Sequence, residues 1–200
     1  MIDNLLLDTL RRGGTILYPT DTVWGLGCDA TNADAIEKIY RIKQRDHTKS
    51  MLLLCAGEEM VRRYVPAPSE DALQLLLHSD RPTTVIFPHA VGLADNLTAA
   101  DGSIAIRVPR ANAGVTDSRG AEFCHELLLA WDRPIVSTSA NLSGEPSPTC
   151  YNAIDPALFP LVDYAVAPSM CSSPSRAIPH LAPSRIVRVA DDGSVTTLRP

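Results

Sequence analysis

Two spacings of apolar residues recur along the chain, and each predicts one kind of element. A spacing of three to four residues over 5–10 predicts a helix, which Gly13 and Gly14 end. The same spacing predicts four more helices, at 31–43, 58–64, 69–78 and 121–131. Five helices are therefore expected.

Short apolar runs and alternating patterns predict strands between these helices. Ile104 and Ile106, for example, alternate with Ala105 and Arg107. Further strands are predicted at 15–18, 51–56, 83–90, 134–141, 163–168, 185–190 and 194–200, the last two joined by a hairpin turn at 191–193. Helices interleaved with about seven or eight strands are typical of an α/β domain with a mixed, twisted sheet.

Length and composition place this sheet in one domain over residues 1–200. The chain is 45% hydrophobic, which is enough to form one core. No apolar run of about 18 residues exists, and the N-terminus has no basic flank, so we expect no membrane segment and a cytoplasmic protein. Five scattered cysteines without a CxxC pair favour reduced thiols.

The charge balance suggests a small anion as the ligand. With 18 basic and 23 acidic residues, the net charge is −5, which argues against a dedicated nucleic-acid binder. Two of the three lysines, Lys43 and Lys49, nevertheless lie within 40–50 beside Arg45. A local basic site inside an acidic body would recruit a small anion better than a long polyanion.

The helix at 31–43 leads into this basic stretch. Thr31 and Asp34 resemble a capping box at its start. One face of the helix gathers four residues, namely Ala33, Ile36, Tyr40 and Lys43. Lys43 is therefore expected at the end of the core-facing stripe.

Polar residues follow three predicted strands, at 19–22, 109–112 and 137–141. Ligands of open α/β sheets bind beyond the carboxyl ends of strands, where loops converge, so we expect a hydroxyl-lined pocket there. Lys43, Arg45 and Lys49 would form its cationic wall and bind a triphosphate. The alternative is that Lys43 only extends past the core while the other two side chains decorate a loop.

Several common site motifs are absent from the sequence. It has no GxxxxGK[ST] phosphate loop, no GxGxxG turn and no GxSxG elbow around Ser139. No histidine spacing indicates a metal, so no protein-held metal site is expected. Turn capping explains the serines of 137–144 better than a nucleophile does.

Six ordered motifs resemble those of the YrdC family across nearly the whole chain. They are PTDTVWGLGCDA at 19–30, KQR at 43–45, RVP at 107–109, STSANLSG at 137–144, PSRIV at 183–187 and LRP at 198–200. The resemblance is to the short, single-domain threonylcarbamoyl-AMP synthases. It implies a twisted mixed sheet with flanking helices around a concave basic cavity.

The resemblance also implies a reaction and its partners. L-threonine and bicarbonate or CO₂ would give N-carboxythreonine, whose carboxylate attacks the α-phosphorus of ATP and releases pyrophosphate. Such a nucleotidyltransferase needs Mg²⁺, carried by the ATP rather than by a dedicated protein site. Its product modifies tRNA through separate threonylcarbamoyl-transfer proteins, and weak binding of tRNA or double-stranded RNA is expected.

Carried over motif by motif, the resemblance assigns site residues. Lys43 and Arg45 would be catalytic, close to the phosphates. The ATP site would contain Arg45, Lys49, Ser103, Ser139, Asn141, Ser147 and Arg199. The threonine site would contain Thr22, Arg107, Ser137 and Ser184. An unpaired interior guanidinium is costly, which favours a functional role for Arg107, suited to the threonine carboxylate.

Four departures from the family pattern leave two alternatives open. Asp46, Leu54 with Cys55, the stretch 79–84, and Arg185 stand where the family usually has other residues. The chain is therefore either a synthase or a divergent YciO-like paralogue that shares the cavity. The other alternative is an RNA-binding module, and the proline-rich segment 168–183 is a candidate lid.

Overall fold

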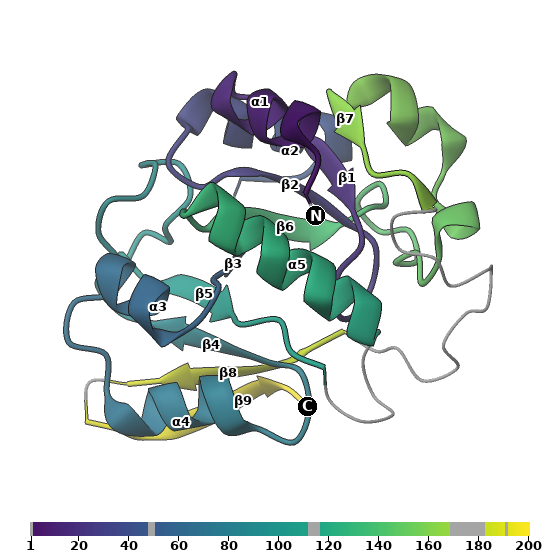
Figure 1. Ribbon diagram of the computed structural model, residues 1–200. Helices are drawn as coiled ribbons and strands as arrows, with labels where there is room; N and C mark the ends of the chain where they lie inside the picture. The colour runs from purple at the N-terminus through teal and green to yellow at the C-terminus, as the bar shows by residue number, and fades with distance from the viewer. Residues whose placement is uncertain (1, 48–50, 112–116, 169–182, 191) are drawn as a thin grey trace.

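The computed structural model describes residues 2–47, 51–111, 117–168, 183–190 and 192–200, and its chain forms a nine-stranded mixed sheet with flanking helices (Figure 1). The α-helices are α1 (Asn4–Arg11), α2 (Ala33–Lys43), α3 (Glu58–Tyr64), α4 (Glu70–His78) and α5 (Ser118–Trp131). Two short 3₁₀ helices are η1 (Tyr151–Ala153) and η2 (Pro156–Leu161). The predicted fold class is confirmed.

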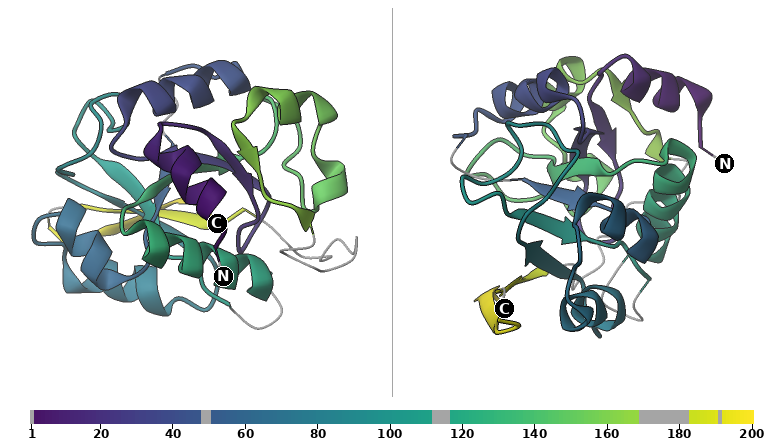
Figure 2. Two further views of the ribbon diagram at one scale, coloured as in Figure 1. Left: turned by 45° about the horizontal axis from the view of Figure 1, so that its top comes forward. Right: turned by 90° about the vertical axis from the view of Figure 1, so that its left-hand side faces the viewer.

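The strands are β1 (Ile16–Tyr18), β2 (Gly25–Asp29), β3 (Leu52–Leu54), β4 (Thr83–Phe87), β5 (Ile104–Arg107), β6 (Ile135–Ser139), β7 (Tyr164–Ala165), β8 (Arg185–Val189) and β9 (Val195–Arg199). Their order in the sheet is β7-β1-β2-β6-β3-β5-β4-β8-β9. The pairs β1/β7, β3/β5 and β4/β8 are parallel, and the others are antiparallel. Figure 2 shows the hairpin β8–β9 at the far end of the sheet from α1.

Two hydrophobic clusters cover the sheet. Helices α2, α3 and α4 pack on one cluster, which includes Ile36, Leu73 and Val85. Helices α1 and α5 pack on the other, where Leu6 and Leu127 are fully buried. No helix among the described residues is both long enough and apolar enough to cross a membrane.

Two local predictions need correction. The N-cap of α2 is Asn32, whose side chain accepts a hydrogen bond from the Ala35 amide, so the capping box at Thr31 is wrong. Ala33 is exposed, and the buried stripe contains Ala35 and Ile39 instead, although it ends at Lys43 as expected. The buried stripe differs from the predicted one because the helix begins after Asn32 rather than after Thr31.

Strand β2 was not predicted from the sequence. All five of its residues are buried, and it pairs with both β1 and β6. Glycine is disfavoured in strands, so the glycines of β2 interrupt the run of apolar residues that would predict a strand. A Cβ at Gly27 would lie 2.7 Å from the Tyr18 ring and 2.7 Å from the Val136 carbonyl oxygen, so close packing between strands requires glycine there.

Candidate active site

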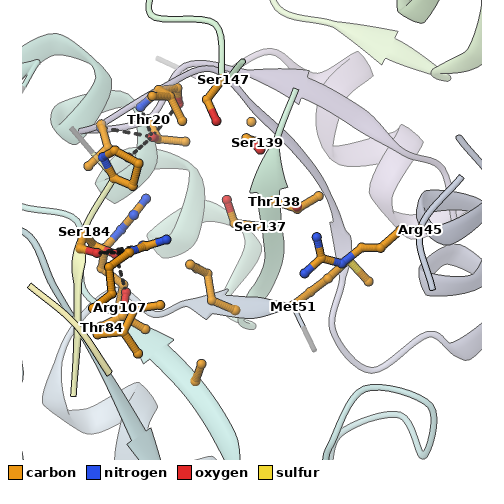
Figure 3. A pocket seen from close by; sticks show the side chains of 18 residues that line it. Thr20, Arg45, Met51, Thr84, Arg107, Ser137, Thr138, Ser139, Ser147 and Ser184 are labelled. Atoms are coloured by element: carbon orange, nitrogen blue, oxygen red, sulfur yellow. Dashed lines mark hydrogen bonds between the residues drawn. The ribbon is translucent and has the colours of Figure 1, made fainter. Parts of the chain in front are cut away.

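A cavity of about 250 Å³, here called the sheet cavity, lies over the middle of the sheet (Figure 3). Strand alternation explains its lining. On β5, Ile104 and Ile106 enter the core, while Ala105 and Arg107 line the cavity. Thr84 lines it from β4 for the same reason. The cavity therefore lies on the face of β4 and β5 that points away from the hydrophobic cluster under α4.

The turn after β1 forms one wall of the sheet cavity. Thr20 Oγ1 accepts hydrogen bonds from the amides of Thr22 and Val23 and donates to the Val23 carbonyl at 2.7 Å. Helix α5 packs tightly on this turn, since a Cβ at Gly120 would lie 2.0 Å from the Thr20 carbonyl oxygen. The turn therefore has little freedom to move.

Arg107 lines the cavity and forms an ion pair with a buried carboxylate behind it. Its Nη2 lies 3.0 Å from Asp21 Oδ1, and the two side chains are 5% and 1% exposed. Arg107 Nε and Asp21 Oδ1 are both buried without a hydrogen-bond partner among the described residues. Burial raises the pKa of Asp21, while the charge of Arg107 opposes that rise.

This ion pair bears on one step of the sequence argument. A functional role for Arg107 was favoured because an unpaired interior guanidinium is costly, and Asp21 supplies a partner. Because arginine stays protonated, the buried guanidinium requires a nearby anion, and its charge favours the ionised form of Asp21.

Arg199 and Ser184 lie beside Arg107. Arg199 donates from Nε and Nη2 to the Ser184 carbonyl at 2.9 and 2.6 Å, and Ser184 Oγ lies 2.7 Å from Thr84 Oγ1. Burial, followed by the positive charge of Arg107, lowers the pKa of Arg199. The two guanidinium groups are thus close enough to repel each other.

Arg45 reaches the sheet cavity from another side. Figure 3 shows its guanidinium across the cavity from Arg107 and Ser184, with Ser137 of β6 between them. Burial lowers the pKa of Arg45, which indicates a partly desolvated cation. Arginine and hydroxyl groups therefore line the cavity from both sides.

Lys43 does not line the sheet cavity, although it was expected near the phosphates. Its ammonium group is buried and donates to the carbonyl oxygens of Ser139 and Asn141 at 2.5 and 2.6 Å. The Ser143 amide donates back to the Lys43 carbonyl at 3.1 Å. Burial, and next the charge of Arg45, lower the pKa of Lys43 to about 8. Lys43 thus joins the end of α2 to the loop after β6.

The structure brings eight of the twelve expected site residues together in the sheet cavity. They are Thr22, Arg45, Arg107, Ser137, Ser139, Ser147, Ser184 and Arg199. Lys43, Asn141 and Ser103 are not among its lining residues. Lys49 lies outside the described residues, as does 169–182 of the expected lid.

Asn141 and Ser103 have other surroundings. The side-chain Nδ2 of Asn141 donates to the backbone carbonyls of Leu142 and Glu145, and these hydrogen bonds close the loop after β6. Ser103 lines a second cavity of about 310 Å³, together with Ile86 and Arg188. Each of these three residues lies two positions from a residue that lines the sheet cavity, namely Ala105, Thr84 and Ile186 in turn. Side chains two positions apart in a strand point to the same face, so the second cavity continues along that face of the sheet.

Sequence reasoning missed Asp21, Thr20 and Thr84. Asp21 and Thr20 belong to the polar turn 19–22, which was recognised, but a loop sequence does not tell which side chain meets Arg107. Thr84 could have been found, because it alternates with Val85 along β4.

Most departures from the family pattern lie away from the cavity wall. Leu54 and Cys55 are buried in the two hydrophobic clusters, and Asp46 is exposed. Arg185 Nη2 donates to Ser79 Oγ at 3.0 Å, so Arg185 and the stretch 79–84 contact each other.

The described part of the chain offers no group of three or more His, Cys, Asp or Glu side chains that could hold a metal. The described residues that line the sheet cavity include three arginines and no acid. Such a lining suits an anion, or a metal ion whose ligands are phosphate and water.

Comparison with known proteins identifies the family. The model of the Sua5/YciO/YrdC family, described as telomere recombination, matches residues 8–200. The chain belongs to this family. Curated relatives include threonylcarbamoyl-AMP synthases of Stenotrophomonas maltophilia (strain K279a), 38% identical, and of Xanthomonas campestris pv. campestris (strain B100), 35% identical. Each match covers 78% of this chain, and it covers 80% and 79% of the respective relatives.

Solved structures share the fold. P. abyssi Sua5 complexed with L-threonine superposes with a TM-score of 0.80 at 22% identity, over 98% of this chain and 53% of that chain. This chain therefore spans about half the length of that Sua5. E. coli YciO superposes with a TM-score of 0.74 at 24% identity, over 98% and 87%.

Proposed function

We propose that this protein is a threonylcarbamoyl-AMP synthase, which makes threonylcarbamoyl-adenylate and pyrophosphate from L-threonine, bicarbonate or CO₂, and ATP. The sheet cavity carries the proposal, because it combines hydroxyl groups with Arg107 and Arg199 on one side and Arg45 on the other. The names of the family relatives point to the same activity.

The proposed chemistry needs positioning and charge neutralisation rather than a nucleophilic side chain. The threonine amine takes up CO₂ to form a carbamate, and a carbamate oxygen then bonds to the α-phosphorus of ATP while the bond to the pyrophosphate oxygen breaks. Two anions must approach each other in this step, and negative charge accumulates on the leaving group. Buried arginines remain charged and can stabilise both.

We place threonine at the Arg107 end and the nucleotide at the Arg45 end. The Arg107 guanidinium lines the cavity and would bind the threonine carboxylate, and Ser137, Ser184 and Thr22 supply hydroxyls nearby. The sheet cavity alone is small for both substrates, so ATP would extend along the sheet face into the cavity at Ser103. Ser139 and Ser147 would complete the nucleotide contacts, and Arg199 would reach the phosphates from the Arg107 side.

Magnesium would enter with the nucleotide. Because no acid lines the sheet cavity among the described residues, the phosphates and water would supply most of its ligands. Transfer of the product to tRNA would need separate proteins. Weak RNA binding stays a prediction, and the net charge of −5 limits its strength.

The decisive measurement is pyrophosphate release from ATP and bicarbonate, with and without L-threonine. Release that depends on threonine is expected, and its absence at every protein concentration would remove the proposal. Arg45→Ala should raise the KM for ATP about tenfold and the KM for threonine less than twofold, because one desolvated charge contact is lost. Arg41→Ala is the matched control, since Arg41 is exposed on α2 and pairs with Glu37.

A further inference from the structure

Asp21 is a buried charge that the proposed reaction leaves without a role. It is 1% exposed, does not line the sheet cavity, and lies 3.0 Å from the Arg107 guanidinium. It sits in the turn between Thr20 and Thr22, both of which do line the cavity. Its carboxylate therefore approaches Arg107 from behind the wall.

The turn holds this carboxylate in a fixed place. The Asp117 amide donates to the Asp21 carbonyl at 3.0 Å, and the Cys124 thiol lies 3.3 Å from the Pro19 carbonyl. The close approach of Gly120 to Thr20 adds a steric limit. Asp21 thus remains beside Arg107 whether or not the cavity is occupied.

Without this carboxylate, two neighbouring guanidinium groups would face the same space. Arg199 is bound to Ser184, which in turn contacts Thr84, and Thr84 pairs with Arg107 across β4 and β5. Paired arginines are a strong site for phosphate groups. The polyphosphate of a nucleotide would then compete for the place of an amino-acid carboxylate.

We propose that Asp21 is a specificity-determining counter-ion, which neutralises Arg107 and so reserves it for a singly charged carboxylate while polyphosphate is left to Arg199 and Arg45. This inference rests on the proposed function. The charge of Arg110 also favours the ionised form of Asp21, and it lies outside the described cavity lining. A neutral pair at the Arg107 end, beside the guanidinium of Arg199, would thus sort two anions of different charge.

Binding experiments with L-threonine and inorganic tripolyphosphate test this without turnover. In the unaltered protein, saturating tripolyphosphate should change the Kd of threonine, measured by calorimetry, less than twofold. In Asp21→Asn it should raise that Kd at least tenfold, because Arg107 and Arg199 then bind the polyanion together. Competition in the unaltered protein, or equal behaviour of Asp21→Asn, would overturn the proposal.

A double variant covers the case in which Asp21→Asn does not fold. Asp21→Asn with Arg107→Gln removes both charges of the buried pair, an exchange that proteins often tolerate. Because the pair carries no net charge, the Kd of tripolyphosphate should stay within threefold of the unaltered value. A tenfold loss would show that Arg107 contributes its charge to the polyanion, and would refute the inference.

Two controls separate the possible failures. Asp132→Asn removes the carboxylate of an exposed pair with Arg63, and should leave threonine and tripolyphosphate independent. If the unaltered protein binds tripolyphosphate but no threonine, the proposed function fails, while the double variant still decides the role of Asp21.

Discussion

Replacing Lys43 by methionine tests whether this lysine supports the loop after β6. The side chain is 1% exposed, and its two short hydrogen bonds join α2 to the carbonyls of Ser139 and Asn141. Methionine has nearly the same length and volume but donates no hydrogen bond. The substitution therefore removes the bonds while it largely keeps the packing.

The structure sets the size of the expected effect. Two hydrogen bonds from a charged donor contribute about 3–6 kcal/mol, at about 1.5–3 kcal/mol each. The pKa of Lys43, lowered to about 8 from 10.5, means that burying the charge costs about 3 kcal/mol, which offsets part of this. A net loss of about 2 kcal/mol would lower the Tm by about 4–8 °C for a chain of this size.

Thermal unfolding and steady-state kinetics check this estimate together. Because the loop carries Ser139, Lys43→Met should raise the KM for ATP about tenfold and the KM for threonine about twofold. Lys38→Met is the matched control, since Lys38 is half exposed and donates to one carbonyl, that of Gly13, at 2.9 Å. If the Tm falls by the same amount in both variants and neither variant changes the KM for ATP, Lys43 does not support the loop.

Two further predictions follow from the pKa of Lys43 and from the packing of Gly120. The folded pKa of Lys43, about 8, lies below the unfolded value of 10.5, so between these values the unfolded chain binds more protons and stability from this group rises with pH. Denaturant titrations should therefore show the deficit of Lys43→Met widening from pH 8 to 10, and a constant deficit would contradict the assignment. Gly120→Ala forces a Cβ to 2.0 Å from the Thr20 carbonyl, which should cost about 1–3 kcal/mol and raise the KM for threonine severalfold. Gly57→Ala, with no atom within 4 Å of its Cβ, should change neither, and similar losses in both variants would refute the steric argument.

The fold was predictable wherever burial follows a regular spacing. Alternation on β5 placed Arg107 on the face opposite Ile106, and the helical stripe of α2 placed Lys43 in the core. Strand β2 was not predictable, because the reason for Gly27 is the neighbouring Tyr18 ring. That contact exists only after β1 and β2 pair.

The site was predictable as a set of segments but not as a set of contacts. The polar turn, the end of β6 and Arg45 meet at one cavity, as expected from strand ends, but the expected residues 109–111 do not line it. The direction of each polar side chain depends on its partner, however. Lys43 turns to two backbone carbonyls, and Arg107 to Asp21, and neither partner is close in sequence.

The different pKa values of arginine and lysine explain how the cations are used. The chain has 15 arginines and three lysines, and the cations that line the sheet cavity among the described residues are all arginines. Burial lowers the pKa of a lysine, as the pKa of Lys43, lowered to about 8, shows, whereas a buried guanidinium keeps its charge. Arginine therefore supplies permanent charge in the sheet cavity, and Lys43 serves where hydrogen bonds are needed, because a neutral amine can still donate to both carbonyls. Asp21 lies beside the buried guanidinium of Arg107, where an unpaired charge would be costly.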